Sequence, residues 1–177
     1  VIDISKIEAG HVTVFPEQFS LRELVEEAAE TIRPQREQKK MNLEITTKVW
    51  PVLQTDRKRL LQCLLNFLSN AVKYSEQGTI TISIQEFDGQ VELAVRDNGI
   101  GIAKEDMSNL FGAFERFESK LKVKAGGTGL GLYLTKKIAS QILQGKVSVE
   151  STLGTGSTFS LCIPKNISNK NEKEIQE

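Results

Sequence analysis

The feature that most restricts the fold is a pair of alternating segments joined by a tight turn. Residues 79–85 and 91–96 alternate apolar and polar side chains, and Asp88-Gly89 lies between them. Period-two alternation is typical of strands with one buried face, and Asp-Gly favours the two-residue turn of a β-hairpin. The sequence therefore predicts an antiparallel pair of strands whose apolar side needs a covering layer.

Segments with helical periodicity can supply that layer. We predict helices from the capping box Ser20-Leu-Arg-Glu23 to about Pro34, over 56–73, over 130–143, and a short one near 104–110. Further strands are expected at 11–15, around Leu43 to Val49, at 146–151 and at 157–163. This order of elements favours an α+β two-layer sandwich with its helices on one face of the sheet.

Length and charge exclude several classes of function. A chain of 177 residues can form one core, and its 23 basic and 23 acidic residues leave a net charge of +0. We therefore expect no nucleic-acid partner, and the lack of a long apolar run predicts no membrane contact by this segment. Cys63 and Cys162 are interpreted as small buried hydrophobes in a reducing compartment, which predicts a cytoplasmic segment even if the parent protein is membrane-anchored.

One helical stripe carries unusual polar residues. Asn66, Asn70 and Lys73 follow one another at i, i+4 and i+7 of the helix predicted over 56–73. Asn is unfavourable inside helices, so two on one stripe require an explanation. Amide oxygens suit a hard cation such as Mg²⁺, and the ammonium suits a phosphate. The alternative is a pair of amides that simply face solvent.

Two glycine-rich segments are candidates for a ligand site. Asp97-Asn-Gly-Ile-Gly-Ile102 directly follows a predicted strand, and Gly126-Gly-Thr-Gly-Leu-Gly-Leu132 leads into a helix, where free amides favour phosphate. The second segment is neither a Walker loop nor a dinucleotide fingerprint, because Leu132 and Leu134 occupy the required Lys and Gly positions. The alternatives are an ordinary turn and a flexible hinge.

In order and spacing, these segments resemble the histidine-kinase ATPase domain of the GHKL superfamily. Asn66 to Tyr74 resembles its N box, and residues 97–102 its first glycine box. Residues 111–117 resemble the F box, 127–132 the second glycine box, and 154–159 the closing Gly-Thr turn. The resemblance covers about residues 20–164 and implies the Bergerat fold, with a mixed, mostly antiparallel sheet.

The resemblance also implies a role for each matched residue. Asp97 would bind the adenine amino group, Asn70 with Asn66 would hold Mg²⁺, Lys73 would contact phosphate, and Tyr74 would lie against ATP. Asn66, Asn70 and Lys73 are the implied catalytic residues. The other implied nucleotide contacts are Gly99, Gly101, Ile102, Phe114, Gly127, Thr128, Gly129, Leu130, Gly131, Leu132 and Thr158.

The resemblance narrows the activity as well. Hydrolytic members of the superfamily carry a water-activating Glu where this chain has Asn66, and an amide is no general base at neutral pH. The expected activity is that of a protein-histidine kinase that transfers the γ-phosphate of ATP to a histidine, for relay to an aspartate of a response-regulator receiver domain. The alternatives are a non-catalytic nucleotide-binding module and a superfamily ATPase.

The phosphoacceptor is expected outside this chain. His11, the only histidine, is followed by Val-Thr-Val-Phe, whereas the family's acceptor is followed by an acidic residue and Arg-Thr-Pro. Residues 1–10 resemble the end of a dimerisation and phosphotransfer domain, which implies a homodimeric parent. The catalytic domain is expected over 11–164, and 165–177 as a polar tail or linker.

Overall fold

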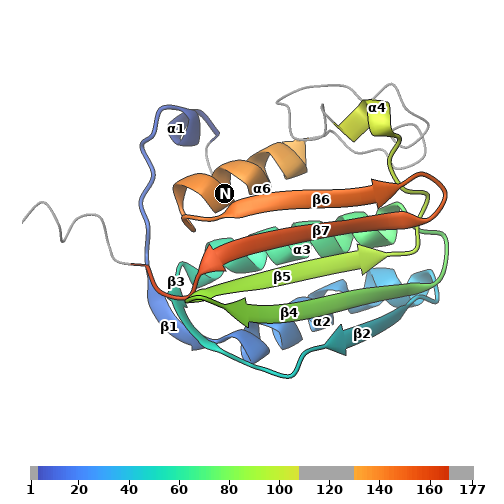
Figure 1. Cartoon of the computed structure of the whole chain (residues 1–177), viewed down its shortest axis with the longest axis horizontal. Coiled ribbons are helices and arrows are strands. Elements are labelled where there is room, and N and C mark those ends of the chain that lie inside the picture. The colour runs from blue at the N-terminus through green and yellow to red at the C-terminus, as the bar shows by residue number, and fades with distance from the viewer. Residues whose placement is uncertain (1–3, 108–129, 168–177) are drawn as a thin grey trace, which may run out of the picture.

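The computed structural model describes residues 4–107 and 130–167, and within them the chain forms a sheet layer and a helix layer (Figure 1). The elements are α1 (Ile4–Glu8), β1 (Glu17–Ser20), α2 (Leu21–Gln38), β2 (Asn42–Thr46), β3 (Val52–Thr55), α3 (Arg57–Lys73), β4 (Thr79–Phe87), β5 (Gln90–Asp97), α4 (Lys104–Met107), α6 (Leu130–Gln141), β6 (Lys146–Thr152) and β7 (Gly156–Pro164).

The main sheet confirms the predicted α+β architecture. Among the described residues it has five strands in the order β2-β4-β5-β7-β6, and β2 pairs with β4 in parallel while the other neighbours are antiparallel. The predicted hairpin joins β4 and β5, with positive φ at both Asp88 (49°) and Gly89 (75°), as its tight turn requires. Helices α2, α3 and α6 cover one face of this sheet, as expected (Figure 1).

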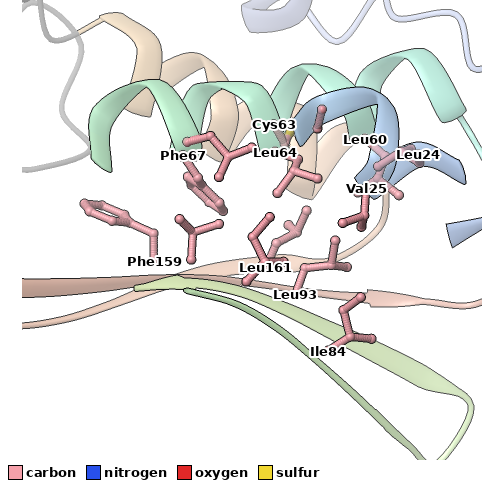
Figure 2. Close-up of a cluster of buried hydrophobic side chains, with 14 of the residues drawn as sticks. Leu24, Val25, Leu60, Cys63, Leu64, Phe67, Ile84, Leu93, Phe159 and Leu161 are labelled. Carbon is pink, nitrogen blue, oxygen red and sulfur yellow. The ribbon is translucent and has the colours of Figure 1, made fainter. Parts of the chain in front are cut away.

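The core lies between α3 and the centre of the sheet. Figure 2 shows Leu64 and Phe67 of α3 directed toward Leu93 of β5 and Leu161 of β7, which are register partners. The ring of Phe67 lies 5.6 Å from that of Phe159, centroid to centroid. All five side chains are buried. Burial of this apolar face fixes the rotation of α3, and thereby the direction of its polar stripe.

Helix α2 begins at the predicted position but differs from the prediction in its cap and in its C-terminal end. Ser20 occupies the N-cap position, but its side chain makes no capping hydrogen bond, so the expected capping box does not form. The helix also continues through Pro34 to Gln38. Proline removes one helical hydrogen bond, yet Pro34 and Glu30 are exposed, so water can bond the freed carbonyl.

The first strands also differ from the prediction. Residues 11–15 form no strand; β1 begins at Glu17 and pairs with β3 in a separate two-stranded sheet. The backbone N–H of Phe15 donates instead to the Asp56 carboxylate (3.2 Å). Strand β3 was not predicted, since its four residues follow Pro51 and show little periodicity.

The two cysteines lie in different environments. Cys63 is fully buried on α3, and burial raises the pKa of its thiol to about 12. The expectation of burial is wrong for Cys162, which is only partly buried. It alternates along β7 with the buried Leu161 and Ile163, so its side chain lies on the face of the sheet without helices. Both thiols are free.

Candidate functional site

The C-terminal end of α3 lies beside the loop that follows β5. The helix begins at the N-cap Asp56, whose carboxylate accepts a hydrogen bond from the backbone N–H of Arg59 (3.2 Å). It ends at Lys73, where the N–H of Tyr74 still donates to the Asn70 carbonyl (3.0 Å). Because the Tyr74 carbonyl in turn accepts from the N–H of Ile100 (3.2 Å), the helix end and the loop are joined directly.

The predicted polar stripe of α3 is present beside its apolar face. Asn66 and Asn70 are partly buried, and Lys73 at the last position is exposed. Tyr74 is partly buried, which raises the pKa of its phenol by desolvation. The stripe therefore presents two amides and one ammonium near the helix end, a set that suits a phosphate with its metal ion.

Asp97 is a buried carboxyl group at the end of β5. Its residue is 4% exposed and, by strand alternation with Val95, its side chain lies on the helix side of the sheet. Oδ1 accepts from the N–H of Gly99 (2.8 Å). Burial raises the pKa of Asp97, and hydrogen bonds from the backbone of Gly99 and Ser157 oppose that rise. A buried carboxylate needs further donors, and the amino group of a purine can supply one.

Gly99 brings several polar atoms to one point. A Cβ at Gly99 would lie 2.3 Å from the carbonyl oxygen of Tyr74, and 2.8 Å from both Asp97 Oδ1 and Ser75 Oγ. Ser75 is 1% exposed, and its hydroxyl has no hydrogen-bond partner among the described residues. An unpartnered buried hydroxyl beside a buried carboxylate fits the polar edge of a nucleotide base.

The rest of the first glycine loop is held by the turn between β6 and β7. The N–H of Gly154 donates to the carbonyl of Ile100 (2.6 Å), and Gly101 lies against the Thr152 carbonyl. The N–H of Ile102, which is buried, donates to Ser151 Oγ (2.7 Å). The loop is therefore fixed from two sides, by α3 and by this turn.

Asn66 connects α3 to the start of α6. Its Nδ2 donates to Thr135 Oγ1 (2.8 Å), and that hydroxyl donates to the Gly131 carbonyl (2.8 Å). A Cβ at Gly131 would lie 2.6 Å from Asn66 Oδ1, so a larger residue would have to displace the Asn66 amide. Leu132 is buried beside it. The amide nitrogen of Asn66 thus positions the start of α6, and its oxygen takes no part in that hydrogen bond.

Thr158 is not brought together with the other predicted residues. It pairs with Arg96 and Glu150, and strand alternation places all three on the face of the sheet opposite Asp97. A cleft of about 270 Å³ adjoins these residues. The neighbour on the Asp97 side is Ser157, whose hydroxyl lies 2.8 Å from Ser151 Oγ.

Several predicted residues lie outside the described part of the chain. These are Phe114, the F box at 111–117, Gly127, Thr128 and Gly129; Leu130 is the first residue of α6. Among residues 4–107 and 130–167 there is no cluster of three His, Cys, Asp or Glu side chains suited to a metal. A metal here would depend on amide oxygens and on the phosphates of a ligand.

Three hydroxyl-bearing residues of the candidate site were not predicted from the sequence. Ser75 follows the N box directly, Thr135 lies at i+4 from Gly131, and Ser151 lies on a different strand. Serine and threonine are common on surfaces, so no local pattern distinguishes these hydroxyls. Separately, no helix in the described ranges is long and apolar enough to cross a bilayer.

Comparisons with known proteins identify the family and agree with the fold. Residues 55–167 match the family model described as "Histidine kinase-, DNA gyrase B-, and HSP90-like ATPase". The circadian input-output histidine kinase CikA of Synechococcus elongatus is 36% identical over 93% of this chain and 22% of its own length. The chain thus spans about a fifth of the length of the curated relatives it matches.

Two solved structures show the same fold at 27% identity each. Full-length ShkA in complex with AMPPNP has a TM-score of 0.79, and the match covers 93% of this chain and 34% of ShkA. The catalytic domain of histidine kinase ThkA has a TM-score of 0.76, and the match covers 86% of this chain and 97% of that domain. The chain therefore belongs to the histidine kinase-, DNA gyrase B- and HSP90-like ATPase family, and within it to the catalytic domains of histidine kinases.

Proposed function

We propose that this domain binds Mg²⁺-ATP and transfers the γ-phosphoryl group to a histidine of a dimerisation and phosphotransfer domain. In the parent protein that domain would form a homodimer, and the phosphoryl group would pass to an aspartate of a response-regulator receiver domain. Several relatives are named as histidine kinases, one of them as a sensor histidine kinase, and ShkA was solved in complex with AMPPNP. A cytoplasmic location, on a parent that is free or membrane-anchored, belongs to the same proposal.

The observation that carries the proposal is the arrangement at Gly99. Asp97 Oδ1 and Ser75 Oγ lie against one point from two elements, and both are buried. A carboxylate accepts from an amino group, whereas a hydroxyl can donate or accept. This pair matches the alternating donors and acceptors of an adenine edge.

The phosphate end of ATP would lie along the polar stripe of α3. Asn70 would hold Mg²⁺ through its amide oxygen, with Asn66 Oδ1 as the second candidate ligand. The exposed ammonium of Lys73 would contact phosphate oxygens. When bound, Mg²⁺ supplies charge neutralisation on the phosphates.

The proposed step is an in-line displacement. An imidazole nitrogen of the acceptor attacks the γ-phosphorus, the N–P bond forms, and the bond to the β,γ-bridging oxygen breaks as ADP leaves. This chain contributes positioning and electrostatic stabilisation. Asn66 cannot take a proton from water, and its amide nitrogen is already bonded to Thr135. That arrangement favours transfer over hydrolysis.

The acceptor would be a different histidine from His11. His11 is exposed and directly follows Gly10, whose φ of 77° ends the turn after α1. This proposal also divides the chain into domains. It assigns residues 1–10 to the end of the phosphotransfer domain, 11–164 to the catalytic domain and 165–177 to a tail. Phe114, Gly127, Thr128 and Gly129 also stay proposed contacts.

Calorimetric titration with ADP and with a non-hydrolysable ATP analogue tests the base site. Asp97→Asn should weaken binding about 100-fold, because one acceptor becomes an amide and a hydrogen bond to a charged group is lost. Asp88→Asn is the matched control, since Asp88 is an exposed residue of the hairpin turn, and its affinity should equal that of the wild type. Unchanged binding in Asp97→Asn would overturn the adenine assignment.

Transfer is tested with radiolabelled ATP and a separately supplied dimerisation domain. The radiolabelled phosphoryl group should reach the acceptor histidine only with Mg²⁺ present, and EDTA should abolish this transfer. Binding without transfer would favour the non-catalytic module. Steady hydrolysis by this chain alone would favour the ATPase.

A further inference from the structure

The carbonyl groups at the end of α3 are bonded by a lysine from another helix. Lys39 Nζ donates to the carbonyls of Val72 (2.6 Å) and Ser75 (2.9 Å), and lies 3.3 Å from that of Lys73. The last carbonyls of a helix lack partners within it, and the C-terminal end of the helix dipole attracts a cation. One ammonium therefore bonds the carbonyls of Val72 and Ser75, on either side of the helix end, and approaches that of Lys73.

The position of Lys39 is itself fixed. It is the C-cap residue of α2, and its backbone N–H donates to the Arg36 carbonyl (3.2 Å). The guanidinium of Arg36 donates to the Met41 carbonyl (2.9 Å), which closes the turn, and Met41 is buried. The lysine stem thus extends from a rigid end of α2 toward α3.

The bonded carbonyls enclose the segment that carries the proposed site. Lys73 and Tyr74 lie between Val72 and Ser75, so the ammonium clamps both ends of this turn. From here the Tyr74 carbonyl bonds the N–H of Ile100, and the Ser75 hydroxyl lies beside Asp97. A shift of the turn would displace the phosphate contact and the base site together.

We propose that Lys39 is a positioning residue of the nucleotide site. Its ammonium holds the last turn of α3 and, through the Tyr74–Ile100 hydrogen bond, the first glycine loop. Lys39 acts without touching the ligand, since its donors are directed at backbone carbonyls. As a claim about nucleotide binding, this inference rests on the proposed function above.

Three variants of the whole chain test the proposal. Lys39→Met keeps the length of the side chain but removes the donors, and Lys39→Arg restores charge and donors in another shape. Lys40→Met is the control, because Lys40 is the adjacent exposed lysine and the substitution removes the same charge. Hydrogen exchange by NMR at the Ile100 amide and titration with ADP are the two readouts.

The expected result is local. In Lys39→Met, exchange at the Ile100 amide should become about tenfold faster relative to that at Leu93 and Leu161 in the core, and the Kd for ADP should rise about tenfold. Lys39→Arg should restore part of the protection of the Ile100 amide and part of the affinity for ADP. Lys40→Met should resemble the wild type in both measurements. Equal acceleration at Ile100, Leu93 and Leu161 with an unchanged Kd would overturn the proposal, as would no change at Ile100.

The two readouts separate this proposal from the one on which it rests. If the wild type binds no adenine nucleotide, the proposed function fails. The exchange rate at Ile100 still decides whether Lys39 holds the loop.

Discussion

The two ends of α3 are stabilised in different ways. At the N-terminal end the Asp56 carboxylate accepts hydrogen bonds from the backbone N–H of Arg59, three residues away, and from that of Phe15, in the segment before β1. At the C-terminal end the carbonyls depend on Lys39, more than thirty residues away, and the loop bonds to Tyr74. Both ends use a long-range contact, but the first end is a cap that lies away from the proposed site, whereas the second holds the turn that carries the site. We therefore expect the two ends to respond differently to mutation.

The largest effect is expected from Gly99→Ala at the C-terminal end. The added methyl would meet the Tyr74 carbonyl at 2.3 Å, which is backbone and cannot move aside. ADP binding should be lost, and the free energy of unfolding should fall by about 3 kcal/mol in urea denaturation. Gly89→Ala is the control: no atom lies within 4 Å of the new methyl, so this substitution introduces the strain of a positive φ (75°) without a steric clash. Normal ADP binding by Gly99→Ala would refute the close contact.

Asp56→Ala tests the N-terminal end. The substitution removes the N-cap of α3 and the acceptor of the Phe15 backbone N–H, so the free energy of unfolding should fall by about 2 kcal/mol. The Kd for ADP should change less than about twofold, because the site lies at the other end of the helix. A rise in Kd as large as that of Lys39→Met would erase the proposed difference between the ends.

The bond between Asn66 and Thr135 should give a smaller effect. A double-mutant cycle with Asn66→Ala and Thr135→Val should yield a coupling of about 1 kcal/mol in the free energy of unfolding. Transfer to the acceptor should fall in both single variants, since both free the second glycine box. A coupling near zero would show that the bond does not hold α6.

The smallest effect concerns the pH dependence of stability. Because burial raises the pKa of Asp97 in the folded state, the folded chain binds this proton more tightly than the unfolded chain. The contribution of Asp97 is fully present below its unfolded pKa and is lost as pH rises through the higher folded pKa. Asp97→Asn should lack this loss, so its stability relative to the wild type should improve from acid to neutral pH. The opposite slope in urea titrations would contradict the direction of the shift.

The ends of α3 also show which features the sequence could predict. The helical spacing of apolar residues such as Leu64 and Leu68 predicted the helix and its buried face, and the Asp88-Gly89 turn predicted the hairpin. These features depend on neighbours in the sequence. Asn66, Asn70 and Lys73 were correctly placed on one stripe because helical periodicity is local as well.

The errors have a common physical origin in long-range contacts. Pro34 is an exception, because α2 continues through it on an exposed side of the helix, where water can bond the freed carbonyl. Strand β3 depends on its pairing with β1 and on the bridge from Gln54 to Asn166, both of them distant in the sequence. Thr158 was assigned to the site by motif, although the pleat directs Ser157 to that side. Lys39 has no local signal, since its acceptors are known only after α2 and α3 meet.

The contact between Gly131 and Asn66 ties the spacing of α3 and α6 to the rotamer of one side chain. A methyl group on Gly131 would meet the Asn66 amide oxygen at 2.6 Å, so a larger residue would have to displace that amide. Displacing the amide would also disturb its hydrogen bond to Thr135 (2.8 Å). The direction of the Asn66 amide and the distance between the two helices are therefore coupled, and a change in one would be transmitted to the other.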